Sequence, residues 1–165
     1  MSIFNIYRHV PMHFRFFLII MMLILSVNAA SQEIQEVRPI SFGSVVILDN
    51  ASPGSINIDF LGNVTISTHF GVIETPLYGI FRLVDYPAHA NLFLTGGIIQ
   101  GQTTSIQFSP EQFTLTNVNL PASVRVESDG TVDFRAGGRI VTSGSGSTTF
   151  ADTTYTSRLI ITVNF

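Results

Sequence analysis

The strongest constraint on the fold is a period-two alternation of apolar and polar residues, repeated in short runs between turn residues. The last run, residues 155–165, shows it most clearly. Its apolar phase consists of Tyr155, Leu159, Ile161, Val163 and Phe165. Successive side chains of a strand point to opposite faces of a sheet, so such runs predict strands. Beyond residue 30 we find no ten-residue stretch with the three- and four-residue spacing of an amphipathic helix. The sequence therefore predicts an all-β fold.

Turn residues divide the chain from residue 39 onward into about nine or ten short strands. Residues 56–60 and 64–70 flank a Leu-Gly-Asn turn and predict a hairpin. Residues 122–128 and 131–137 flank Asp-Gly, which suits a two-residue hairpin turn. Gly96 and Gly97 predict a further turn. Many short strands with this punctuation are typical of an antiparallel β-sandwich or a small barrel.

The first 29 residues read as a secretory signal peptide. A basic start is followed by an apolar run, residues 16–27, and then by small residues. Val27 and Ala29 fit the third and first positions before a cleavage site. The alternative is an uncleaved anchor, although the run is shorter than the roughly 20 residues that cross a bilayer. We expect an exported protein, with residues 30–165 as a single β-sandwich domain in the periplasm, at the cell surface or outside the cell.

Composition excludes several kinds of function. From Ala30 onward the chain has six Arg, no Lys and eleven acidic residues, and six minus eleven gives a net charge of −5. No basic cluster is present to neutralise phosphates, so we expect no nucleic-acid partner. The chain has no Cys, which excludes thiol redox chemistry and thiolate metal sites. The predicted core must therefore hold the domain together by packing, and no cofactor is expected.

No catalytic constellation is apparent, and we expect a protein that is not an enzyme and has no small-molecule substrate. After the leader the only histidines are His69, in a predicted strand, and His89, in a loop. Neither lies in a nucleophile elbow, and the Gly-Ser-Gly-Ser stretch 144–147 has the wrong spacing for one.

Two groups of oxygen ligands were weighed as cation sites. Glu127, Asp129 and Asp133 gather at the Asp-Gly hairpin, and Asp49 and Asn50 lie in a loop. A complete calcium-loop pattern is absent, so we interpret both groups as turn residues. The aromatic residues are better explained by core packing than by a sugar-binding platform. Those placed in the inward phase are Phe60, Phe70, Phe81, Phe93, Phe108, Phe113, Phe134 and Phe150.

Several segments together resemble the bacterial secreted family known as domain of unknown function 4402. The segments are ISFGSVV (40–46), GSINIDFLGN (54–63), GIFRLVDYPAHANLFLT (79–95), FRAGGRIVTS (134–143) and YTSRLIITVNF (155–165). The chain departs from the family pattern at Asp85, where a Gly is usual, and before Tyr155, where a Gly is common. The resemblance implies an exported immunoglobulin-like or pilin-like β-domain of surface structures, and it brings no known active site.

The terminal run admits three interpretations. It closes the sandwich, it pairs with a strand of another subunit or an export chaperone, or it is the insertion signal of an outer-membrane barrel. The barrel is disfavoured because the strands are short and polar and no Trp is present. We expect a closing strand and take Tyr155, Leu159, Ile161, Val163 and Phe165 as a candidate assembly strand. The expected function is structural or adhesive, and a secreted carbohydrate-binding module is the other alternative.

Overall fold

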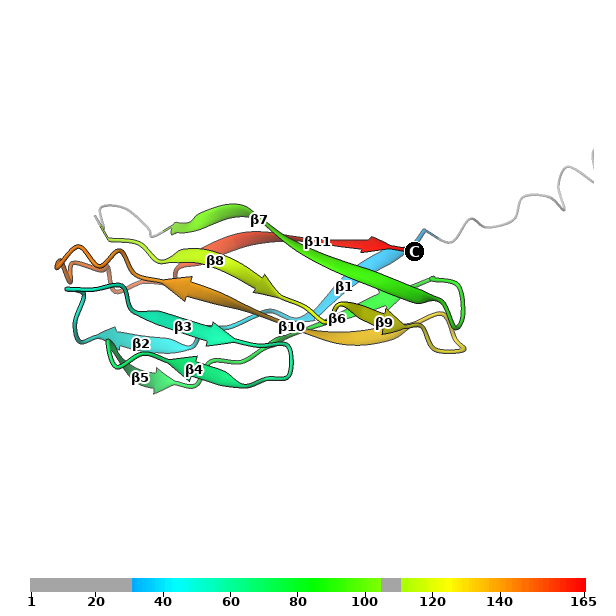
Figure 1. Ribbon diagram of the computed structural model, residues 1–165, viewed down its shortest axis with the longest axis horizontal. Coiled ribbons are helices and arrows are strands. Elements are labelled where there is room, and N and C mark those ends of the chain that lie inside the picture. Colours follow the sequence, from blue (N-terminus) through cyan, green and yellow to red (C-terminus); the bar gives the residue numbers. More distant parts are fainter. Residues whose placement is uncertain (1–30, 105–110) are drawn as a thin grey trace, which may run out of the picture. The chain divides into compact units, whose positions relative to one another are not determined.

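The computed structural model describes residues 31–104 and 111–165, and within them all regular structure is β-strand. The compact unit Gln32–Phe165 holds one nine-stranded sheet and one two-stranded sheet (Figure 1). The strands are β1 (Glu33–Arg38), β2 (Ser44–Ile47), β3 (Ser55–Ile58), β4 (Val64–Ile66), β5 (Phe70–Glu74), β6 (Gly79–Val84), β7 (Asn91–Thr104), β8 (Thr114–Asn119), β9 (Ser123–Arg125), β10 (Val132–Val141) and β11 (Thr156–Asn164). The predicted all-β fold is confirmed.

Every ladder of the large sheet is antiparallel, and its main order is β1-β6-β10-β8-β7-β11. Strand β3 joins the side of β10 and carries β4, while β9 joins β7. Within the described residues the ladder between β8 and β7 consists of one pair, Thr114 opposite Gln102. The sheet folds over at this weak link, and its two halves pack on each other as the layers of a sandwich.

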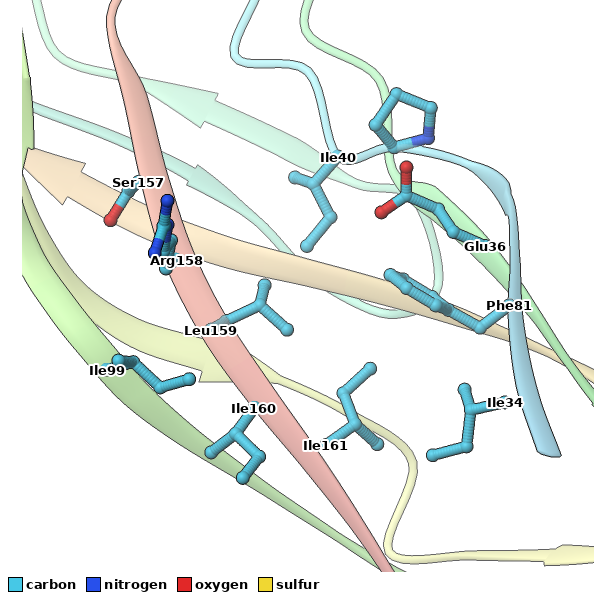
Figure 2. A pocket seen from close by; sticks show the side chains of 11 residues that line it. Ile34, Glu36, Ile40, Phe81, Ile99, Ser157, Arg158, Leu159, Ile160 and Ile161 are labelled. Carbon is cyan, nitrogen blue, oxygen red and sulfur yellow. The ribbon is translucent and has the colours of Figure 1, made fainter. Parts of the chain in front are cut away.

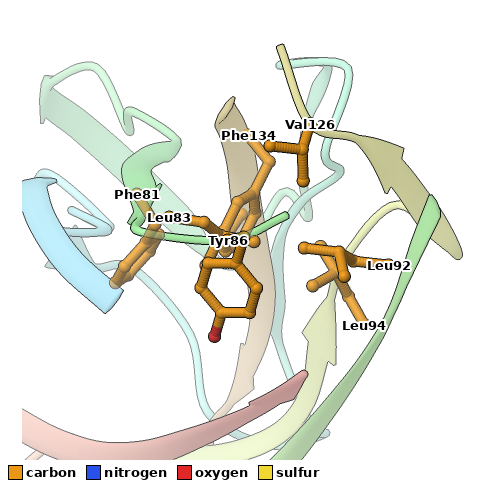
Figure 3. Packing of buried hydrophobic residues seen from close by; sticks show 8 residues of the cluster. Phe81, Leu83, Tyr86, Leu92, Leu94, Val126 and Phe134 are labelled. Carbon is orange, nitrogen blue, oxygen red and sulfur yellow. The ribbon is translucent and has the colours of Figure 1, made fainter. Parts of the chain in front are cut away.

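The main core lies between the two halves of the sheet. Phe81 and Leu83 of β6 and Phe134 of β10 meet Leu92 and Leu94 of β7 (Figure 3). The rings of Phe81 and Phe134 stack at 5.7 Å between centroids. Leu83 and Leu92 are fully buried, and each such side chain contributes about 1.5–3 kcal/mol.

A second cluster fills the other end of the sandwich. Phe113 contacts the rings of Phe70, Phe150 and Tyr155, and its centroid lies 4.9 Å from that of Tyr155. Tyr155 thus anchors the start of the terminal strand in the core, as its phase in the sequence predicts. Its hydroxyl donates to the carbonyl of Ala151 at 3.0 Å.

The first predicted hairpin is confirmed, since β3 and β4 pair around Gly62, whose φ is +95°. The turn at Gly96 and Gly97 is wrong, because β7 runs straight through both residues. A Cβ on Gly96 would lie 2.8 Å from Val118, and one on Gly97 would lie 2.9 Å from Ile160. These glycines let neighbouring side chains approach the strand closely. From the sequence alone, a Gly-Gly pair with this role cannot be told from a turn.

The hairpin predicted at Asp129-Gly130 is also wrong as a strand pair. The turn forms, because the amide of Gly130 donates to the carbonyl of Glu127 and that of Glu127 to Thr131. Only Gly130 of the two central residues has a positive φ, +82°, so the turn is not the expected two-residue type. The flanking strands then separate, since β9 pairs with β7 and β10 with β6.

Strand β1 was not predicted, and Asp85 after β6 has an unusual backbone conformation. The register of β1 against β6 shifts between Glu36 and Arg38, so one extra residue breaks the alternation. Asp85 adopts a φ of +63°, a left-handed conformation that Gly enters at least cost.

The terminal strand mostly follows its predicted phase. Leu159, Ile161 and Val163 pack against the two core clusters, and Ile160 points outward with 49% of its surface exposed. The prediction is wrong for Phe165, which is 67% exposed because the ladder with β7 ends at Asn164. Core placement is likewise wrong for Phe60 and Phe93, which are exposed. Phe108 and the cleavage residues Val27 and Ala29 lie outside the described residues.

The role of the terminal strand is testable by truncation. Deletion of residues 162–165 removes the pairs with Phe93, Leu94 and Thr95 and uncovers the core beside Val163. We expect loss of cooperative unfolding in circular dichroism, because ladder bonds and buried area disappear together. Deletion of Phe165 alone is the control, and it should lower the free energy of unfolding by less than about 1 kcal/mol. A cooperatively folded 162–165 deletion would contradict this assignment.

Candidate functional site

The most distinctive surface feature is an open groove between β1 and β11, the strands at the two ends of the main path of the large sheet. Among the described residues β1 pairs only with β6, and β11 only with β7. A groove of about 520 Å³ runs between them, and we call it the seam (Figure 2). Its lining residues are Ile34, Glu36, Pro39, Ile40, Phe81, Ile99, Ser157, Arg158, Leu159, Ile160 and Ile161.

The floor of the seam is apolar and continuous with the core. Ile34, Ile40 and Phe81 lie on one side, facing Leu159 and Ile161 of β11 (Figure 2). Each of these side chains also packs against one of the core clusters. The seam therefore exposes core-type surface at the place where the two layers separate.

The rims of the seam carry opposite charges and unpaired backbone. Glu36 of β1 and Arg158 of β11 lie on opposite sides of it (Figure 2). The outer edge of each strand presents N–H and C=O groups that no neighbouring strand of the described part binds. Strand β11 has no Pro or Lys, the residues that most often block an exposed edge.

The topology fixes how a guest strand would run in the seam. Five antiparallel ladders separate β1 from β11, so these two strands point in opposite directions. A strand laid between them is antiparallel to one and parallel to the other. The longer edge, nine residues of β11 against six of β1, favours antiparallel pairing with β11.

The predicted assembly residues meet at this site only in part. Leu159 and Ile161 line the seam, whereas Tyr155 and Val163 belong to the core clusters. Phe165 contributes an exposed ring, 6.2 Å from that of Tyr86. Ile34, Glu36 and Ile40 complete the seam and were missed, because β1 shows no alternation in the sequence.

His69 makes hydroxyl contacts, but they do not form a catalytic triad. Its Nε2 lies 2.8 Å from the Oγ of Ser52, and its Nδ1 lies 3.2 Å from the Oγ of Ser67. A triad carboxylate binds the ring nitrogen opposite the nucleophile. The carboxylate of Asp49 instead lies 3.9 Å from Nε2, on the side of Ser52. His89 is exposed in its loop with a φ of +63°.

One carboxylate beside the turn at Asp129 and Gly130 is paired with an arginine. Asp133 accepts two bonds from Arg82, at 2.6 and 2.8 Å, and this contact lowers the pKa of the carboxyl. Asp129 accepts from the backbone and hydroxyl of Thr131, which lowers its pKa as well. These residues and Glu127 surround a polar hollow of about 390 Å³. Within the described residues no three His, Cys, Asp or Glu side chains are grouped as metal ligands.

A buried carboxylate holds the Ser-rich loop, and sequence reasoning missed it. Glu111 is 7% exposed and accepts from the hydroxyls of Ser143 and Ser145, each at 2.5 Å. Asn50, 1% exposed, donates to the carbonyl of Ser147 and accepts from the amide of Gly144. Ser143, Ser145 and Ser147 alternate in the sequence. This alternation is the signal that could have indicated an extended segment whose hydroxyl groups point to the same side.

Comparisons with known proteins found no match to this chain. No family model matches it, and no curated protein and no solved structure matches it either. The resemblance to domain of unknown function 4402 therefore stays a prediction. In the described ranges no helix has the length and apolar character needed to cross a membrane.

Glu111 predicts a specific acid sensitivity. Hydrogen bonds from Ser143, and then Ser145, lower the pKa of its carboxyl below the ordinary value of 4.5. A lowered folded-state pKa contributes stability above the unfolded value, and that stability is lost as pH falls below about 4.5. We expect Glu111→Gln to be less stable than the parent protein at pH 7. Its stability should also fall by a smaller amount than that of the parent when the solution is acidified.

The matched control is Glu127→Gln, because Glu127 is an exposed residue beside the turn at Asp129 and Gly130. Thermal unfolding followed by circular dichroism between pH 7 and pH 3 gives the comparison. Parallel pH profiles for the parent and Glu111→Gln would show that Glu111 does not carry this effect.

Proposed function

We propose that this chain is an exported, non-enzymatic β-sandwich protein with a structural or adhesive role in the periplasm or at the cell surface. In this role the seam receives a strand of another subunit, which extends the sheet from β11. The open seam is the observation that carries the proposal. The leader pattern of residues 1–29 and the resemblance to domain of unknown function 4402 support export.

Strand addition suits the chemistry of the seam. A guest strand would bind the free backbone groups of the β11 edge and place alternate apolar side chains on the floor formed by Ile34, Phe81 and Ile161. Backbone pairing supplies affinity, and the floor supplies selectivity for apolar residues at every second position. An acidic residue beside Arg158 and a basic one beside Glu36 would fix the register.

The proposal is tested by a charge placed inside or outside the seam. Ile34→Lys puts a cation on the floor, whereas Val37→Lys on the same strand alters a residue that is 54% exposed and does not line the seam. We expect Ile34→Lys to reduce assembly of the full-length chain in its native cell at least tenfold. Val37→Lys should assemble like the parent.

Assembly is measured by cross-linking and native mass spectrometry of fractionated cells, with thermal unfolding as a check that both variants fold. A parent protein that is strictly monomeric would contradict the strand-accepting role. Equal behaviour of the two folded variants would contradict the seam as its location. Retention of the parent protein in the cytoplasm would contradict export.

A further inference from the structure

The outward face of β1, β6 and β10 brings together arginines from distant parts of the chain. Arg38 of β1 and Arg135 of β10 both lie opposite Ile80 of β6, one on each side. Tyr78 precedes Ile80 by two residues, and Arg139 follows Arg135 by four along β10. We call Arg38, Tyr78, Arg135 and Arg139 the arginine face.

Two of these guanidinium groups share one aromatic ring. The Cζ of Arg38 lies 4.5 Å from the ring centroid of Tyr78, and that of Arg135 lies 4.7 Å from it. The sum, 9.2 Å, is the greatest separation that the two charges can have. Arg38 donates from Nε to the carbonyl of Tyr78, and Arg135 donates from Nη1 to that of Leu61. Each guanidinium has five N–H donors, so these contacts leave donors unused, although the Nη2 of Arg38 is buried.

The positive charge of this face is not neutralised by the described part of the protein. Ion pairs there join Arg82 to Asp133 and His69 to Asp49, and none involves an arginine of the arginine face. Asp133, two residues before Arg135 on β10, is engaged by Arg82. Three uncompensated cations on one face are unexpected in a chain whose net charge is negative.

Side-chain amides extend the polar surface beside Arg139. In the ladders of β10, Asn57 of β3 and Asn117 of β8 are the two residues opposite Arg139. Asn119 reaches across Gly137 and donates to the Oδ1 of Asn57 at 3.1 Å. A Cβ on Gly137 would collide with the backbone carbonyls of Ile58 and Asp59, so the glycine lets this part of the chain approach β10 closely. Guanidinium, amide and phenol groups therefore lie on neighbouring strands, with Gly137 and the backbone of Ile58 between Arg135 and Arg139.

We propose that the arginine face binds an acidic polysaccharide, a chain of sugars that carries carboxylate or sulfate groups. Arginine pairs with such oxyanions through two parallel N–H bonds. Cations on separate strands suit anionic groups repeated along a polymer better than one small anion. The amides of Asn57 and Asn117 and the hydroxyl of Tyr78 offer donors and acceptors for sugar hydroxyls. This site lies apart from the seam and does not depend on strand addition.

The test uses full-length protein recovered from expressing cells, with heparin as the sulfated probe, polygalacturonate as the carboxylated probe and dextran as the neutral one. Binding is measured by surface plasmon resonance at several salt concentrations. We expect binding to at least one acidic probe and none to dextran. Affinity should fall as salt rises, because bound cations are released from the polyanion.

Matched substitutions locate the site. Arg135→Gln and Arg139→Gln should each weaken binding about tenfold and lower the salt slope by about one. The control Arg125→Gln on β9 removes the same charge elsewhere and should change affinity less than twofold. Arg139 makes no cation–π contact with Tyr78, so its variant separates ligand binding from packing, and thermal unfolding checks folding. Equal losses in all three variants, or no binding of either acidic probe, would overturn the proposal.

Discussion

The need of every strand for backbone partners on both edges governs this structure. Inside the sheet the backbone N–H and C=O groups of each strand bind those of its neighbours. In the order β1-β6-β10-β8-β7-β11, the outer edges of β1 and β11 have no neighbouring strand in the described part of the chain. The sheet folds at the single Gln102–Thr114 pair, and the main core forms between its two halves. This bend in the sheet places the outer edges of β1 and β11 along the seam. Core-type residues such as Phe81 and Leu159 then line a groove at the surface.

The terminal strand pairs with β7 along one edge and packs its inward side chains in the core. In the proposed role its other edge, which no strand of the described part occupies, receives a second chain. The outward face of β1, β6 and β10 is separate from this edge, because Arg38 and Arg135 project from the opposite side of the sheet from Phe81 and Phe134. A domain built so can join neighbours along one side and contact an anionic ligand on another.

The sequence predicted those parts of the structure that depend on local periodicity. Alternation around Leu159 and Ile161 correctly indicated a closing strand, and the turn at Gly62 correctly indicated a hairpin. Sequence reasoning did not predict the features that depend on strand register. These are the bulge in β1, the unbroken course of β7 through Gly96, and the separation of β9 from β10. Glu111 meets Ser143 from 32 positions away, and Arg38 meets Tyr78 from 40, so neither contact follows from neighbouring residues.

The central claim is that the β11 edge is open in the isolated protein and is filled on assembly. Amide hydrogen exchange, resolved by residue across Thr156–Asn164 in purified monomer and in native assembled material, tests it most directly. The structure predicts that the amides directed away from β7 exchange rapidly in the monomer and become at least a hundredfold slower in the assembly, while those bonded to β7 are protected in both. Protection of every β11 amide in the monomer, or unchanged exchange on assembly, would contradict the account.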